Sequence, residues 1–160
     1  MEIERKFLFN GEVEKMWTCP VKSIKQSYLS YTPEVRIREK QDKYYLTVKS
    51  KGDKVREEYE LEISQNTYED LYKNRQPNSL ISKFRFIVPL KNNLKAEVDF
   101  YENVYVDDTN SLKVIEVEFE SEEKSNSFII PNWFGREVTN DNRYKNGYIA
   151  KYWDKDNFLI

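Results

Sequence analysis

Apolar and polar residues alternate along most of this chain, and a period of two residues is typical of a β-strand. In the opening segment MEIERKFLF, Glu2, Glu4 and Lys6 fall on one face of such a strand, while Ile3 and Phe7 fall on the other. The alternation returns in seven later segments, which are residues 24–31, 34–40, 44–50, 56–63, 83–88, 94–102 and 113–120. The pattern therefore predicts about eight strands, joined mostly by short turns. Antiparallel pairing is expected, because a parallel crossover needs roughly a dozen residues or more.

Three segments break the alternation and predict short helices. They span residues 64–74, 121–128 and 143–153, and Ser64 or Asn66 is the expected N-cap of the first. Residues 131–135 are expected to be a connector. No internal repeat, low-complexity tract or Pro/Gly/Ser-rich linker divides the sequence, so residues 1–160 are predicted to form a single domain.

The composition narrows the classes of function. The chain has 39% hydrophobic and 15% aromatic residues, which is enough to fill a core, and its net charge is only −2. This balance gives no overall positive field, so no nucleic-acid partner is expected. Histidine is absent, which excludes Ser-His and Cys-His nucleophiles. The four glycines do not form a Gly-rich loop, so a P-loop or Rossmann site has no support.

Cysteine content and hydropathy bear on the location of the protein. Cys19 is the only cysteine, so neither an internal disulfide nor a cysteine metal cluster can form. No apolar run reaches the roughly 18 residues that a membrane helix needs. The acidic start, Met1-Glu2, does not resemble a signal peptide. The sequence therefore predicts a cytoplasmic protein with no membrane partner.

The charged faces of the predicted strands allow two interpretations. On any one strand, a charged face is most simply a face turned to water. Taken together, eight strands are enough to close a barrel, which removes exposed strand edges. In that barrel the apolar faces would turn outward beneath covering helices, and the ionisable faces would surround a polar lumen. The expected lumen cations are Lys6, Arg36, Arg38, Lys49, Lys83 and Arg85, and the expected acids are Glu2, Glu4, Glu58, Glu60, Glu97, Asp99, Glu116 and Glu118.

Such a lumen indicates a charged ligand, because buried charges are costly without partners. The cations suit a compact polyanion, since arginine forks match phosphate oxygens and lysine supplies point charge. Carboxylates do not attract phosphate, so their presence beside the cations indicates a divalent metal ion that bridges the two. Mg²⁺ binds carboxylates, water and phosphate oxygens and needs no histidine. Acid pairs two residues apart, at Glu2/Glu4 and Glu116/Glu118, are suitable ligands.

These motifs resemble those of the CYTH proteins, also called triphosphate tunnel metalloenzymes. The family's N-terminal Glu-x-Glu-x-Lys is present as Glu2, Glu4 and Lys6, and the likeness continues in order through RIR, TVKS, EEYELEI, KFRF, EVDFY, VIEVEFE and WFGREVTNDNRYKN. It covers nearly the whole chain and is strongest to the small single-domain bacterial members. The resemblance implies a mainly β (α+β) fold, a closed eight-stranded antiparallel barrel with a few helices packed outside. The tunnel would bind triphosphate with Mg²⁺ or Mn²⁺, as two ions.

The resemblance also implies roles for individual residues. Phosphate binding would fall to Lys6, Arg36, Arg38, Lys49, Lys83, Arg85 and, from the last helix, Lys145. The metal ligands would be Glu2, Glu4, Glu116 and Glu118, with Asp99. Asp99 and Glu60 would complete the acidic wall and hold a second metal ion or the attacking water. Lys6, Glu60 and Asp99 are therefore the expected catalytic set.

Within this family, the sequence favours a metal-dependent hydrolase of inorganic triphosphate (tripolyphosphate), which releases diphosphate and phosphate. ATP and thiamine triphosphate are alternative substrates, and a homodimer is left open. A class IV-type adenylyl cyclase is a second hypothesis, in which Tyr28, Tyr31, Tyr44 and Tyr45 would stack on a base, although tyrosines on strands more often serve packing. A third is a non-catalytic binder of polyphosphate or nucleotide, against which the acidic set argues.

Overall fold

The computed structural model describes residues 2–51 and 55–152, and for Glu2 the backbone alone. The strands are β1 (Glu2–Phe9), β2 (Val21–Tyr31), β3 (Glu34–Lys40), β4 (Lys43–Lys49), β5 (Val55–Arg56), β6 (Glu58–Ile63), β7 (Ile81–Pro89), β8 (Lys95–Tyr105), β9 (Ser111–Phe119) and β10 (Phe134–Glu137). The α-helices are α1 (Gln65–Tyr72), α2 (Glu122–Asn126) and α3 (Asn146–Tyr152), and the 3₁₀ turns are η1 (Val13–Met16), η2 (Lys91–Asn93) and η3 (Asn142–Tyr144). No helix in these ranges is both long and apolar enough to cross a bilayer.

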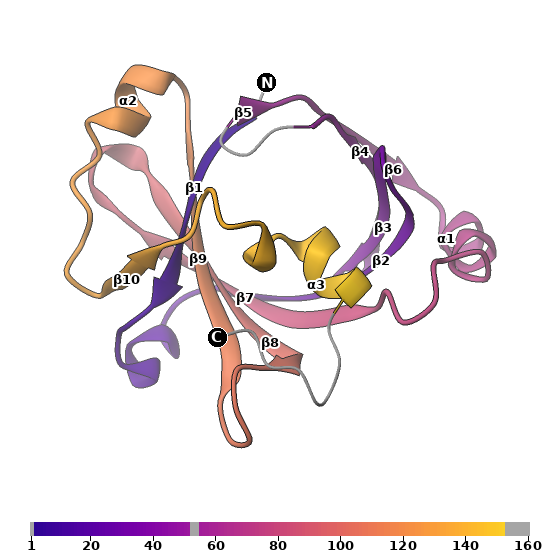
Figure 1. Cartoon of the computed structure of the whole chain (residues 1–160), viewed down its shortest axis with the longest axis horizontal. Coiled ribbons are helices and arrows are strands. Elements are labelled where there is room, and N and C mark those ends of the chain that lie inside the picture. The colour runs from indigo at the N-terminus through magenta and orange to yellow at the C-terminus, as the bar shows by residue number, and fades with distance from the viewer. Residues whose placement is uncertain (1, 52–54, 153–160) are drawn as a thin grey trace.

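The strands close into a ring, as Figure 1 shows. Every strand pair in the described part of the chain is antiparallel, and the order is β10-β1-β9-β8-β7-β2-β3-β4-β6. β5 closes the ring by pairing with β1, where Glu2 lies opposite Arg56. The predicted closed antiparallel barrel is confirmed. Its wall contains nine described strands and not eight, because Glu57 separates β5 from β6, and β10 pairs with β1 as a tenth strand.

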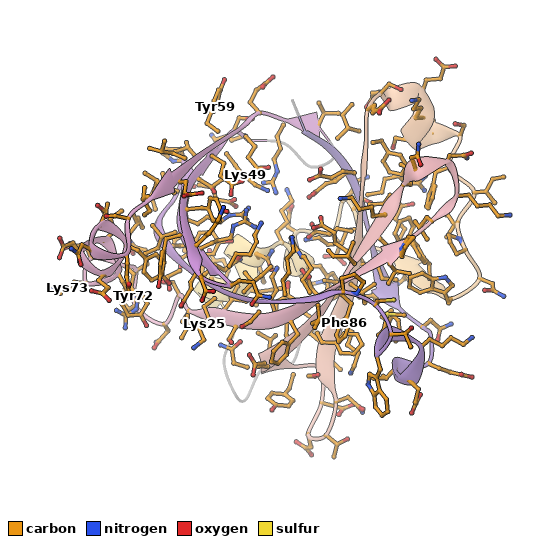
Figure 2. The ribbon with its side chains drawn as sticks, turned by 180° about the vertical axis from the view of Figure 1, so that it is seen from behind. Lys25, Lys49, Tyr59, Tyr72, Lys73 and Phe86 are labelled. Atoms are coloured by element: carbon orange, nitrogen blue, oxygen red, sulfur yellow. The ribbon has the colours of Figure 1, made fainter. Side chains whose placement is uncertain are left out.

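Charged side chains point into the barrel because the alternation is in register from strand to strand. Lys6 pairs with Glu116 across β1 and β9, and Arg85 pairs with Asp99 across β7 and β8. Both pairs are buried, with Asp99 0% exposed. Figure 2 shows Lys49 pointing into the ring, while Tyr59 of the neighbouring strand points away from it. The polar lumen predicted from the sequence is therefore present.

The outward faces of β1, β8 and β9 carry one of the two apolar clusters of the described chain. Ile3, Phe7 and Val117 belong to one apolar cluster with Phe134 of β10, and Phe128 packs against this cluster from the segment after α2. The segment that was expected to be a plain connector thus supplies a strand that covers the outside of the barrel, because the apolar face of β1 needs a partner against water.

The last helices cover one end of the ring, as Figure 1 shows. Tyr144 of η3 and Ile149 of α3 belong to one buried cluster with Tyr28 of β2 and Tyr101 of β8. These two strand tyrosines lie on the lumen face, so this end of the barrel is apolar and needs an apolar cover. The predicted single helix over 143–153 is divided, because Lys145 has an extended backbone (ψ 136°) between η3 and α3.

Candidate active site

The barrel encloses a cavity of about 660 Å³, which is in the usual range for a small-molecule site. Its lining is mostly ionisable. Among the residues singled out from the sequence, the lining includes Glu4, Lys6, Arg36, Arg38, Lys49, Glu58, Glu60, Lys83, Arg85, Glu97, Glu116 and Glu118. The structure therefore brings most of the predicted set to one surface, although these residues come from seven strands spread over more than a hundred positions of the chain.

Cations dominate the wall formed by β3, β4 and β7. Arg36 and Arg38 are both 5% exposed, and each lies two residues from the other on the lumen face of β3. Burial and the neighbouring Arg36 and Arg85 lower the pKa of Arg38 to about 10. These cations are crowded together, so an added polyanion would relieve their mutual repulsion.

Several ion pairs in this wall are long. Arg36 Nη2 lies 3.6 Å from Glu58 Oε1, Lys49 Nζ lies 3.8 Å from Glu58 Oε2, and Arg38 Nη2 lies 3.3 Å from Glu60 Oε1. A strong charge-assisted hydrogen bond is about 2.7–2.9 Å long. Because these contacts are longer, phosphate oxygens can replace them at modest cost.

Carboxylates dominate the wall formed by β1 and β9. Glu4 lies directly opposite Glu118 in the register, and Lys6 lies opposite Glu116. Facing like charges destabilise a sheet unless a cation lies near them. Burial would raise the pKa of Glu116, but Lys6, at 3.3 Å from Nζ to Oε1, and Arg85 outweigh burial and hold this pKa well below its ordinary value.

The acids offer oxygen donors suited to a hard cation. Among the described residues, no group of three or more His, Cys, Asp or Glu side chains is placed to hold a metal ion. Mg²⁺ does not need such a group, since one or two carboxylates with water and substrate phosphate satisfy it. The facing pair Glu4/Glu118 fits that requirement. Glu2 precedes Glu4 by two positions on β1, but its side chain lies outside the described residues.

Asp99 differs from its predicted position, because it does not line the cavity. Its Oδ2 accepts hydrogen bonds from Lys83 Nζ at 2.8 Å and Arg85 Nη2 at 2.9 Å, and its Oδ1 accepts one from Arg85 Nε at 2.7 Å. Burial opposes ionisation, but these two cations hold the pKa of Asp99 below its ordinary value. Both oxygens of this carboxylate are therefore engaged in hydrogen bonds beneath the cationic wall, where Asp99 fixes the orientation of Lys83 and Arg85.

Lys145 also lies apart from the main cavity. It lines a second pocket of about 10 Å³, room for one water molecule, together with Glu4, Lys6, Arg56 and Thr139. Lys6 connects this end of the barrel to the site, because its Nζ donates a hydrogen bond to the carbonyl of Tyr144 at 2.9 Å.

The cavity contains residues that the sequence interpretation did not assign to the site. The polar ones are Glu34, Lys40, Arg56, Asn93, Lys95, Glu120 and Asn146. Arg56 shares the alternation of Glu58 and Glu60, and Lys40 shares that of Arg36 and Arg38, so the period-2 pattern contained the signal for both. Asn146 had no such signal, since only the packing of α3 over the end of the barrel brings it there.

Three of the four tyrosines considered for stacking on a base pack against other rings, and the fourth, Tyr45, has its ring centroid 5.4 Å from Lys40 Nζ. The rings of Tyr28 and Tyr31 stack on each other with centroids 5.4 Å apart, and Tyr44 packs against Tyr68 of α1 at 4.9 Å. Of the four tyrosines considered, Tyr28 alone lines the cavity, and it is fully buried. None of these four rings is therefore exposed on the lining of the described cavity.

Comparison with known proteins gives full-length relatives, although no family model matches the chain. An inorganic triphosphatase from Nitrosomonas europaea is 36% identical over 157 residues, which cover 93% of this chain and 96% of the relative. One from Acetivibrio thermocellus is 32% identical over 153 residues, covering 94% and 93%. A solved structure of an inorganic triphosphatase matches with a TM-score of 0.66 and 33% identity over 96% of each chain.

A more distant structure shares the fold alone. It is a protein from Hippeastrum proposed as an adenylyl cyclase, in which triphosphatase activity is dominant, with 16% identity and a TM-score of 0.58 over 79% of this chain and 83% of that one. The barrel, its charged lumen and the full-length identity to two triphosphatases agree with the motifs of the sequence. The chain belongs to the inorganic triphosphatases of the CYTH, or triphosphate tunnel metalloenzyme, family.

Proposed function

We propose that this protein hydrolyses inorganic triphosphate to diphosphate and phosphate inside the barrel. The observation that carries the proposal is the cavity of about 660 Å³ with buried cations on one wall and facing carboxylates on the other. Hydrolysis of a phosphoanhydride needs neutralised oxygens, a positioned water and an in-line leaving group. The relatives named inorganic triphosphatase support this choice of reaction.

The residues of the cationic wall bind the phosphate chain in this proposal. Arg36, Arg38, Lys49, Lys83 and Arg85 supply the charge, and Lys6 adds a cation from the opposite wall. Arginine forks orient the phosphoryl oxygens, which holds the reacting phosphorus in one place. Asp99 is left out of the metal ligands and acts as a positioning residue for Lys83 and Arg85. Lys145 is proposed to act from the small pocket at the closed end.

Glu4 and Glu118 would hold a divalent ion, Mg²⁺ or Mn²⁺, with Glu2 as a further ligand. The facing pair Glu97 and Glu116 offers donors for a second ion, although Glu97 lies 3.1 Å from Arg85 and Glu116 lies 3.3 Å from Lys6. When bound, such an ion neutralises phosphate charge and makes a bound water more acidic. Glu60, which is partly exposed on β6, is the carboxylate proposed to orient the attacking water, since imidazole is absent from the chain.

The lining favours a substrate without a base. The tyrosine packing described above removes the observation on which a cyclase would depend, so the cyclase and the nucleotide substrates have no separate support here. A cytoplasmic location stays a prediction from the sequence, and a homodimer stays open.

The proposal is tested by phosphate release from tripolyphosphate, ATP and thiamine triphosphate, each with Mg²⁺, with Mn²⁺ and with a chelator. We expect tripolyphosphate to be hydrolysed fastest and the chelator to stop turnover. Equal or faster hydrolysis of ATP would remove the substrate preference. Cyclic AMP formed from ATP would establish the cyclase, and tight binding of tripolyphosphate without product would establish the binder.

Alkaline pH is expected to weaken substrate capture through Lys40, which lines the cavity. Burial, Arg38 and Arg85 lower the pKa of Lys40 to about 8. Lys40 therefore carries its charge at pH values below this pKa and loses it at higher pH, so kcat/KM should fall as the pH rises through about 8.

Lys40→Met should reduce kcat/KM at neutral pH. The substitution should have a smaller effect at about two pH units above the pKa of Lys40, where the wild-type side chain has lost its charge. Lys25→Met, which changes a side chain that points away from the ring in Figure 2, is the control. An equal Lys40→Met effect at both pH values would contradict the assignment.

A further inference from the structure

Arg56 lines both the main cavity and the small pocket at the closed end, as Glu4 and Lys6 do. It comes from β5, the two-residue strand that closes the ring against β1. Its Nη2 lies 3.9 Å from Glu4 Oε1, and its Nη1 lies 3.9 Å from Glu34 Oε1. The guanidinium therefore lies between an acid proposed to hold the metal ion and a second acid on β3.

The contacts of Arg56 with Glu4 and Glu34 are longer than the hydrogen bonds that Arg85 makes. Arg85 donates to Asp99 at 2.7 Å and 2.9 Å, which is the length of strong charge-assisted hydrogen bonds. At 3.9 Å, Arg56 attracts Glu4 and Glu34 through charge and makes no strong hydrogen bond with those two oxygens. Little is lost when such a contact is exchanged for another anion.

Glu34 connects Arg56 to the phosphate-binding wall. Its other oxygen, Oε2, lies 4.0 Å from Arg36 Nη1. The order of charges across the cavity is therefore Glu4, Arg56, Glu34 and Arg36, with alternating sign. A positive ion at Glu4 would weaken the first attraction in this series and repel the guanidinium, while a phosphate chain beside Arg36 would attract it.

We propose that Arg56 competes with the divalent ion for Glu4 and, once displaced, binds the phosphate chain of the substrate. Arg56 neutralises Glu4 while the site lacks metal, and it joins the cationic wall when metal and substrate are both present. Arg56 thereby couples metal binding to substrate binding. This inference rests on the proposed function. It adds a substrate-binding residue, Arg56, and an order of events in which the metal ion first replaces Arg56 at Glu4 and Arg56 then binds the phosphate chain.

Opposite changes in two affinities test the inference. Mn²⁺ binding is measured by electron paramagnetic resonance without substrate, and KM is measured with tripolyphosphate. In Arg56→Gln we expect Mn²⁺ to bind more tightly, by about tenfold, because a competing positive charge is gone. We expect KM to rise about tenfold, because a charge-assisted phosphate contact is lost. Arg143→Gln is the matched control, since that exposed arginine pairs with Asp141 at 2.7 Å.

A structural role for Arg56 would give a different result, namely weaker binding of both Mn²⁺ and tripolyphosphate. Unchanged or weaker Mn²⁺ binding in a folded Arg56→Gln variant would overturn the inference. If that variant does not fold, Arg56→Lys carries the test, because it keeps the charge but not the fork. Arg56→Lys should then bind Mn²⁺ like the wild type with a raised KM, and a wild-type KM would overturn the inference. The Mn²⁺ titration needs no turnover, so a wild type that releases no phosphate defeats the proposed function without deciding the competition at Glu4.

Discussion

Glu118→Gln is expected to lower kcat/KM for tripolyphosphate by at least ~10²-fold, because even residues that only orient a metal ligand cost 10–100-fold when they are changed. Glu118 lies opposite Glu4 on the lumen face, and this pair supplies the proposed oxygen donors for the divalent ion. The amide keeps the size of the side chain and removes its charge. The loss should therefore be larger at limiting Mg²⁺ than at saturating Mg²⁺, and both conditions are measured by phosphate release.

Glu62→Gln is the control for this experiment. Glu62 lies on β6 and does not line the cavity, and its exposed carboxylate lies 3.8 Å from Lys43 Nζ. We expect a change in kcat/KM of less than about threefold, since exposed ion pairs contribute little. Full activity of Glu118→Gln at limiting Mg²⁺ would show that the metal ion binds elsewhere.

Asp99→Asn is expected to lower the free energy of unfolding by about 3–5 kcal/mol, because it leaves two buried cations without their counter-charge. Lys83 and Arg85 together donate three hydrogen bonds to this carboxylate, which is fully buried. Activity should fall as well, since both cations lose the group that orients them. The stability change is measured by urea denaturation, with Asp70→Asn as a control at an exposed pair with Lys73.

The effect of Asp99→Asn should depend on pH in a defined direction. The cations hold the pKa of Asp99 below its ordinary value in the folded protein. A lowered carboxyl pKa stabilises the fold at pH values above the unfolded pKa, and this contribution is lost as the pH falls through the folded pKa. The stability difference between wild type and Asp99→Asn should therefore shrink on acidification. A constant difference across the acid range would mean that the ionised carboxylate is not the source of the stability.

Excess phosphate separates two roles of Asp99, which are balancing the charge of Lys83 and Arg85 and positioning these two side chains. If Asp99 only balances the charge of Lys83 and Arg85, inorganic phosphate should stabilise Asp99→Asn more than it stabilises the wild type, because an anion can approach the uncovered cations. Thermal unfolding with and without phosphate measures this difference. Equal stabilisation of both proteins would indicate that the cations become inaccessible in the variant.

Local pattern predicted much of the site because strand geometry is periodic. Arg36 and Arg38 had to share a face once β3 formed, and Glu116 and Glu118 had to share one on β9. The same argument contained Arg56 and Lys40, which were not assigned to the site. The two residues whose positions differ most from expectation are Asp99 and Lys145. The position of Asp99 depends on its depth in the wall and that of Lys145 on the extended backbone between η3 and α3, and period-2 alternation carries information about neither.

The sequence by itself determined the strands, their two-faced character and the family to which the motifs belong, because a pleated backbone places alternate side chains on opposite sides whatever surrounds it. The tertiary structure decided which charges reach the cavity and which neutralise one another beneath its surface. It also placed η3 and α3 over one end of the ring and brought Arg56 between Glu4 and Glu34. Those outcomes depend on closure and packing between segments distant in sequence, and burial of the apolar end of the barrel is the physical force that selects them.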